Sequence, residues 1–297
     1  PMGDARGNLF QYESTGRLNQ NQLILSLRNP QSSKRSITLT YLLNKAMSDT
    51  DGPETFPVNS YDLRSEYGRS DLDIRHRFLM SGVFSFKHGF SLNPFILAAS
   101  GRPFNITTGR DANGDTLFTE RPSFATDLNQ PGVTRTRFGA FNENPRAGEQ
   151  LIPRNYGTSA AFFTVSLRAS KTWGFGEARS RTSAATQPQT DKQAKQQSGK
   201  GKGSTNQSRG SVGNGSVLPD ASRSDFFGRS SESRYKLTLS VVARNIFNRT
   251  NPGRSVGNLN SLLFGQSNFL APPYGFGDGG DTNAANRRIE AQLRFTF

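Results

Sequence analysis

The last eleven residues of the chain alternate between polar and apolar side chains and end on an aromatic residue. Ile289, Ala291, Leu293, Phe295 and Phe297 share one face of an extended strand, and polar side chains occupy the other face. A strand of about ten residues is long enough to cross the hydrocarbon core of a bilayer at a tilt. The pattern therefore predicts a transmembrane strand that closes a β-barrel, with Leu293, Phe295 and Phe297 as its terminal signal.

A soluble β-sandwich is the alternative, because its strands also alternate between a buried and a solvated face. Whether the pattern recurs along the chain helps to separate the two. Six further segments alternate in a similar way, some less cleanly: residues 22–28, 36–44, 74–86, 90–106, 163–175 and 235–247. Pro94 lies in the fourth segment and has no backbone N–H, so we expect a local bulge or a strand edge there.

The connections between these segments sort by length. Residues 29–33 and 87–89 have the composition of tight turns, whereas residues 47–71, 107–159 and 248–286 are long and polar. Counted back from the carboxyl terminus, the tight turns fall on one side of the sheet and the long connections on the other. This asymmetry is typical of bacterial outer-membrane barrels, and a soluble sandwich has no reason to show it. Trp173 and Phe175 lie where a strand would leave the bilayer, which suits an aromatic girdle.

The predicted fold class is therefore all-β: the C-terminal part of an antiparallel transmembrane β-barrel with about seven strands, spanning residues 1–297 and located in the cell outer membrane. Residues 176–232 interrupt it on the short-turn, periplasmic side. They are rich in Ser, Gly, Gln, Lys and Arg, and they cannot bury enough apolar surface to offset their chain entropy. We expect this insert to be disordered.

Composition excludes several other classes of protein. The mean hydropathy is −0.64 with 33% hydrophobic residues, and no apolar run reaches the roughly 18 residues of a membrane helix. The absence of cysteine excludes a disulfide framework and a thiolate metal site. The net charge of +14 is spread over the chain without aromatic interleaving, which argues against a nucleic-acid partner. The partner that we expect for the strands is outer-membrane lipid.

Two sets of residues are candidates for function. If the strand register is right, seven basic side chains face the lumen: Arg75, Arg77, Arg168, Lys236, Arg244, Arg288 and Arg294. Separately, Asp111, Asn113 and Asp115 place oxygen ligands at alternate positions, with Glu120 nearby, as at the start of a calcium loop. The spacing of an EF-hand is not met, and a polar turn made of Asp, Asn and Gly is the simpler interpretation. Calcium is the only cofactor that the sequence suggests.

No catalytic constellation stands out in the sequence, so we do not expect an enzyme. The only histidines are His76, within a predicted strand, and His88, in a predicted turn. Neither lies in a nucleophile or metal motif, and we expect a structural or solvated role for both.

Several ordered motifs resemble a known family of membrane proteins. They are SEYGRS (65–70), DIRHRF (73–78), SGRPFNITTG (100–109), DANGD (111–115) with Arg121 and Pro122, ARNIFNRTN (243–251) and LRFTF (293–297). Together they resemble the barrel of Oar-like TonB-dependent outer-membrane receptors, from about residue 8 to the end apart from the insert.

The resemblance implies a barrel of about 22 strands, an N-terminal plug domain and coupling to an inner-membrane TonB complex. This chain would supply only the C-terminal third, as a fragment or a truncated gene product. The function implied is energised uptake of a ligand that the sequence does not identify, and the basic lumen would contact an acidic plug or guide anionic solutes. A passive outer-membrane adhesin or structural barrel, and a secreted soluble all-β binding module, are the alternatives.

Overall fold

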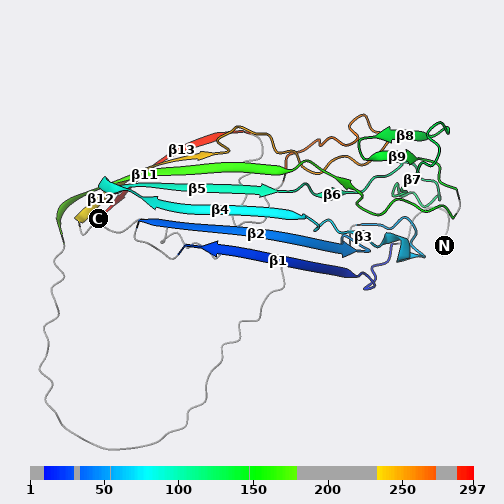
Figure 1. The fold of residues 1–297 in the computed structure, drawn as a ribbon, viewed down its shortest axis with the longest axis horizontal. Coiled ribbons are helices and arrows are strands. Elements are labelled where there is room, and N and C mark those ends of the chain that lie inside the picture. The colour runs from blue at the N-terminus through cyan, green and yellow to red at the C-terminus, as the bar shows by residue number, and fades with distance from the viewer. Residues whose placement is uncertain (1–9, 30–33, 54, 147, 179–232, 272–285) are drawn as a thin grey trace, which may run out of the picture.

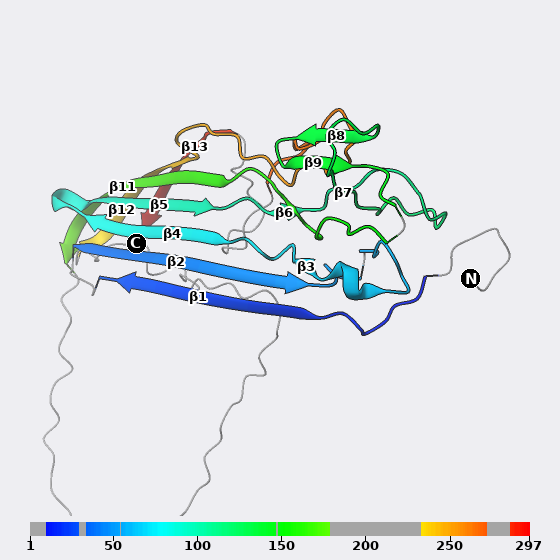
Figure 2. The same cartoon turned by 45° about the vertical axis from the view of Figure 1, so that its right-hand side comes forward.

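The computed structural model describes residues 10–178 and 233–297, apart from residues 30–33, 54, 147 and 272–285. Seven long strands form one continuous antiparallel path, and each pairs with its neighbours in chain order. They are β1 (Leu18–Arg28), β2 (Arg35–Ser48), β4 (His76–Ser85), β5 (Phe90–Ala99), β11 (Phe162–Ala178), β12 (Ser233–Arg244) and β13 (Arg288–Thr296). The predicted all-β meander of seven strands is confirmed, and the sheet is strongly curved (Figures 1 and 2).

The two ends of this sheet differ as the connection lengths predict. The β4–β5 turn contains the short 3₁₀ helix η2 (Lys87–Gly89), and it lies at the same end as the carboxyl terminus (Figure 1). The long connections gather at the opposite end, and we call residues 49–75, 100–161 and 245–271 the loop layer. Most of the predicted insert, residues 179–232, lies outside the described residues, as do residues 30–33 of the first turn.

The loop layer contains the short elements of the fold. These are η1 (Leu63–Glu66), β3 (Gly68–Arg69), β6 (Pro103–Phe104), β7 (Ser123–Phe124), β8 (Val133–Thr136), β9 (Gly139–Asn142) and β10 (Gly157–Thr158). Strand β3 extends the main sheet beside β2, β6 pairs with β10, and β7, β9 and β8 form a separate small sheet. Its buried apolar cluster consists of Phe104, Ile106, Phe141, Ile152 and Leu259. The layer therefore has a core of its own.

Several predicted strand boundaries are wrong. Strand β1 begins at Leu18 instead of residue 22, and β2 continues to Ser48 instead of residue 44. Strand β5 ends at Ala99 instead of Ile106, because the chain turns away at Gly101, where a Cβ atom would lie 1.8 Å from the Ser159 carbonyl oxygen. Strand β12 ends at Arg244 instead of Phe247, since Asn245 adopts a φ of 46°, which ends an extended strand. Strand β11 continues past Phe175 to Ala178 through an irregularity in its pairing with β12, and Gly176 there has a φ of 86°.

Pro94 produces neither the bulge nor the strand edge that we expected. Strand β5 is central in the sheet, and its register with β4 is the same on both sides of Pro94, from Ser81↔Phe95 to Phe84↔Leu92. The pairing is interrupted only between those two positions, where the proline has no N–H to donate. Gly82 faces Pro94 across the strands, and a Cβ atom at Gly82 would already lie 3.4 Å from the proline ring. The absent side chain leaves room for the ring, so the strand stays regular.

In the part of the chain that the structure describes, no helix has the length and apolar character needed to cross a membrane.

Candidate membrane-spanning surface and loop-layer sites

The register of the seven strands places the predicted apolar residues on one common face. Leu25 pairs with Tyr41, Tyr41 with Phe78, Phe78 with Ala98, and Ala98 with Phe163. Leu239 likewise lies between Lys171 and Leu293. Residues directly opposite in an antiparallel ladder project to the same side of the sheet. We call this side the apolar face and the opposite side the inner face.

On the apolar face, among the strand residues whose side chains are described, the basic and histidine side chains place their polar groups toward the ends of the sheet. Arg35 lies at the short-turn end, and Lys45 and His76 lie at the loop-layer end. Lys171 is in the middle of β11, but its ammonium donates to the His88 carbonyl in the β4–β5 turn. The His76 imidazole hydrogen-bonds the Tyr41 hydroxyl at 2.8 Å, and the rings stack. Long basic side chains near the end of a membrane span can extend their charge to the interface. An uncharged band is left between the two ends.

Much of the apolar face is exposed, whereas apolar residues of β4 and β5 on the inner face are buried. Leu239, Leu293 and Phe295 are 39%, 66% and 52% exposed, while Leu79 and Leu97 on the inner face are only 3% and 5% exposed. A soluble sandwich would bury the apolar side of its sheet against a second layer. A contiguous exposed face of this kind requires an apolar partner outside the chain.

Aromatic side chains flank the uncharged band at both ends. At the short-turn end Phe175, Tyr235 and Phe295 stack with centroid distances of 6.0–6.2 Å, beside Trp173. At the loop-layer end Phe163 stacks on Phe247 at 6.3 Å. Aromatic girdles at both interfaces are a feature of transmembrane barrels, where the rings sit at headgroup level.

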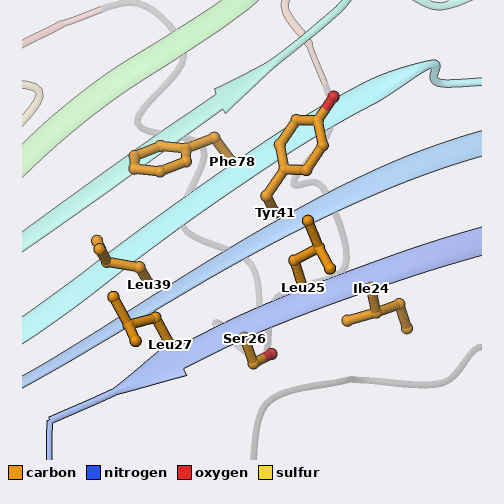
Figure 3. A pocket seen from close by; sticks show the side chains of 7 residues that line it. All are labelled: Ile24, Leu25, Ser26, Leu27, Leu39, Tyr41 and Phe78. Atoms are coloured by element: carbon orange, nitrogen blue, oxygen red, sulfur yellow. The ribbon is translucent and has the colours of Figure 1, made fainter.

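A shallow hollow near β1 belongs to this same surface (Figure 3). Leu25, Leu27, Leu39, Tyr41 and Phe78 line it from the apolar face, together with Ile24 and Ser26 of β1. Its walls carry no charged group. The hollow suits a lipid acyl chain better than a polar solute.

The inner face is polar and basic. Six of the seven predicted lumen residues occupy inner-face register positions within strands: Arg77, Arg168, Lys236, Arg244, Arg288 and Arg294. Arg28, which we did not single out, joins them, and Glu290 is the one acidic residue at such a position in the described strands. The Arg288 guanidinium lies 2.7 Å from the Glu290 carboxylate, and Arg168 donates to the Ser240 hydroxyl at 3.1 Å. Arg75 precedes β4 and pairs with Asp73 at 3.2 Å.

One part of the inner face is apolar, which the sequence pattern did not predict. Leu79, Leu97, Ala99 and Phe162 form a buried cluster with Ile74 and Ala271 of the loop layer. The loop layer therefore folds back over the inner face near its own end of the strands. This explains why Leu79 breaks the clean alternation of β4.

The loop layer is held together by buried ion pairs. The Arg121 guanidinium donates two hydrogen bonds of 2.9 Å to the Glu66 carboxylate, and both side chains are almost fully buried. Arg154 pairs with Asp51 at 2.5 Å, and Asp51 also accepts from the Asp71 N–H at 2.8 Å.

Three aspartates in the loop layer have lowered pKa values, and two of them, Asp51 and Asp73, belong to its buried polar network. Burial by itself raises the pKa of Asp51, but hydrogen bonds from Asp71, Arg154 and Asn155 outweigh it and hold the pKa below its ordinary value. Burial likewise raises the pKa of Asp73. Hydrogen bonds from the Ala46 N–H and from the Arg69 and Arg75 side chains outweigh burial, so the pKa of Asp73 also lies below its ordinary value.

The structure brings two of the three predicted calcium ligands together with Glu120. One carboxylate oxygen from each of Asp111, Asp115 and Glu120 lies within 4.8 Å of the others. The Asn113 side chain is engaged elsewhere, because its amide nitrogen donates to the Val58 carbonyl at 3.2 Å and to Asp115 at 2.9 Å. Glu120 lies outside the alternating DANGD motif, so that motif alone gives no signal for it as a ligand.

A curved antiparallel sheet with an exposed apolar face, aromatic girdles and a basic inner face defines the wall of a transmembrane β-barrel. A family model described as an outer membrane beta barrel domain matches residues 1–274. The chain therefore belongs to the outer membrane β-barrel domain family, and its location is the outer membrane. No curated protein and no solved structure matches the chain significantly.

Proposed function

We propose that the chain forms the C-terminal part of the barrel of a TonB-dependent receptor that takes up a ligand across the outer membrane. The resemblance of its ordered motifs to Oar-like receptors supports this proposal beyond the membership of the barrel family. A plug domain and the TonB complex would be partners in this mechanism.

The observation that carries the proposal is the basic inner face together with two open sheet edges. Strands β1 and β13 each have one edge without a partner strand among the described residues. Backbone groups at such edges cannot stay unpaired in lipid, so further strands must complete the wall. A completed wall would enclose a wide lumen, because barrel diameter grows with strand number. The arginines of the inner face would then contact an acidic plug or an anionic solute.

Conductance across planar bilayers tests the proposal. The protein, purified from outer membranes, is expected to show no steady conductance in a KCl gradient, because a plug fills the lumen. Urea sufficient to unfold the plug should open an anion-selective conductance. That selectivity should fall in the double variant Arg168→Gln and Arg294→Gln, which removes two inner-face charges. A steady open conductance without urea would instead indicate a passive barrel and overturn the proposal.

Uptake by cells provides the second measurement. Dissipating the proton gradient should abolish accumulation of the solutes that the protein imports, as measured by comparing a strain that carries the gene with a deletion strain. Accumulation that continues without the gradient would exclude TonB coupling.

A further inference from the structure

Three carboxylates meet in one turn of the loop layer, and the geometry of their oxygen atoms matches a single metal ion. One oxygen each from Asp111, Asp115 and Glu120 lies within 4.8 Å of the other two. Calcium binds oxygen ligands at about 2.3–2.6 Å, so two ligands on opposite sides of one calcium ion are about 5 Å apart. All three oxygens can therefore reach the same ion.

A second, independent observation concerns the state of Glu120. Glu120 is only 8% exposed to solvent. The Oε1 atom accepts from the Ala112 N–H at 3.0 Å and the Asn113 N–H at 3.4 Å, whereas Oε2 is buried without a hydrogen-bond partner. A buried carboxylate oxygen without a donor is costly, and each such group in a folded protein calls for an explanation. A cation among the three carboxylates supplies the missing partner.

The backbone of the turn already orients the other two acids. Asp111 accepts hydrogen bonds from the N–H groups of Gly114, Asp115 and Thr116, and Asp115 accepts from the N–H of Leu117. These backbone bonds orient both carboxylates. The cluster also contains oxygen donors only, which selects a hard cation.

We propose that Asp111, Asp115 and Glu120 bind one calcium ion, with water completing the coordination shell. Calcium fits better than magnesium because calcium accepts irregular coordination by protein oxygens, whereas magnesium demands nearly octahedral geometry at about 2.0–2.1 Å and usually keeps several of its waters. The ion would tie the turn at residues 111–116 to Glu120, which adjoins the buried Arg121–Glu66 pair. Calcium then stabilises the loop layer. This inference does not depend on the transport function.

Calorimetric titration of the folded protein in detergent with CaCl₂ tests the site. We expect one ion per chain with a dissociation constant on the order of 10⁻⁴–10⁻³ M, as in extracellular calcium modules. Glu120→Gln keeps the shape of the side chain and an acceptor for the two N–H groups, and it should weaken calcium binding at least about tenfold because it removes one charged ligand. Asp127→Asn is the matched control, since Asp127 is an exposed loop-layer acid outside the cluster.

Thermal unfolding separates loss of the site from loss of the fold. Calcium should raise the melting temperature of the wild type and of Asp127→Asn but leave that of Glu120→Gln unchanged. In chelator, Glu120→Gln should melt no lower than the wild type, because it removes a buried, uncompensated charge. Equal calcium affinity in the wild type and Glu120→Gln would overturn the proposal, and so would equal affinity for magnesium or the absence of any heat.

Discussion

The membrane-spanning sheet and the loop layer are stabilised in opposite ways. The sheet repeats one arrangement, in which a ladder of backbone hydrogen bonds joins each strand to the next and the apolar face requires only lipid. The loop layer has short strands, and its order depends on particular polar partners such as Arg121 with Glu66 and Asp51 with Arg154. The sheet should therefore tolerate many substitutions of the same polarity, whereas the loop layer should be sensitive to the loss of a single partner.

The largest effect should come from breaking the buried pair in the loop layer. Arg121→Met leaves the Glu66 carboxylate buried without its partner, which should destabilise the loop layer by about 3–5 kcal/mol. Hydrogen exchange measured by mass spectrometry should show faster exchange across residues 55–66 and 119–125. The strands of the sheet should keep their protection.

Arg64→Met is the control for this substitution. Arg64 pairs with Asp62 on the same 3₁₀ helix as Glu66, but its side chain is 92% exposed, so solvent screens the pair. We expect no measurable change in exchange. If Arg121→Met behaved like Arg64→Met, the loop layer would not depend on its buried charges.

A smaller effect should follow from placing a charge on the apolar face. Leu293→Arg puts a guanidinium against lipid near the middle of β13 and should cost about 2–4 kcal/mol of folding stability in a bilayer. Gln292→Arg, one residue away, places the same group on the inner face, where water and other polar groups solvate it. Folding yield into vesicles, followed by the heat-modifiable gel shift, should fall for Leu293→Arg only. Equal losses would mean that the two faces are not distinguished by lipid.

The smallest effect is a dependence on pH that is confined to the loop layer. The pKa values of Asp51 and Asp73 lie below the ordinary value of 3.8, whereas in the unfolded chain both would titrate near it. Their contribution to stability is therefore complete above about pH 4 and is lost as the pH falls through the folded pKa values.

Limited proteolysis between pH 7 and pH 3 measures this dependence. Cleavage in the loop layer should rise at the acidic end while the sheet stays resistant. Asp73→Asn should make the dependence shallower, and Asp127→Asn should keep the slope of the wild type. An identical slope in all three proteins would show that these aspartates do not link the loop layer to pH.

The sheet could be predicted from the sequence because period-two alternation is a local signal. Leu237, Leu239 and Val241, for example, show their common face within one strand, and the order of the strands in the sheet is the chain order. The boundaries at Ala99 and Arg244 could not be predicted, since they depend on contacts of Gly101 with Ser159 and on the left-handed conformation of Asn245. Alternation also does not predict that Leu79 is buried, because Leu79 lies on the inner face and is covered there by residues of the loop layer.

The partners within the loop layer lie beyond local sequence signals. Glu66 and Arg121 are 55 positions apart, and Asn155 reaches Asp51 across 104 positions. The candidate metal cluster could be predicted in part. Asp111 and Asp115 share a recognisable turn motif, but Glu120 joins them only because the chain folds back beside Ala112 and Asn113. Such contacts depend on which distant segments of the chain come together. The period-two alternation of apolar residues carries no information about this.

The edges of β1 and β13, which have no partner strand among the described residues, also matter before the chain is inserted into the membrane. In water, rows of unsatisfied backbone donors and acceptors recruit strands from any neighbouring molecule. Transit to the membrane is thus the stage at which copies of the precursor are most prone to aggregate with one another. Successful biogenesis requires delivery that is either fast or shielded.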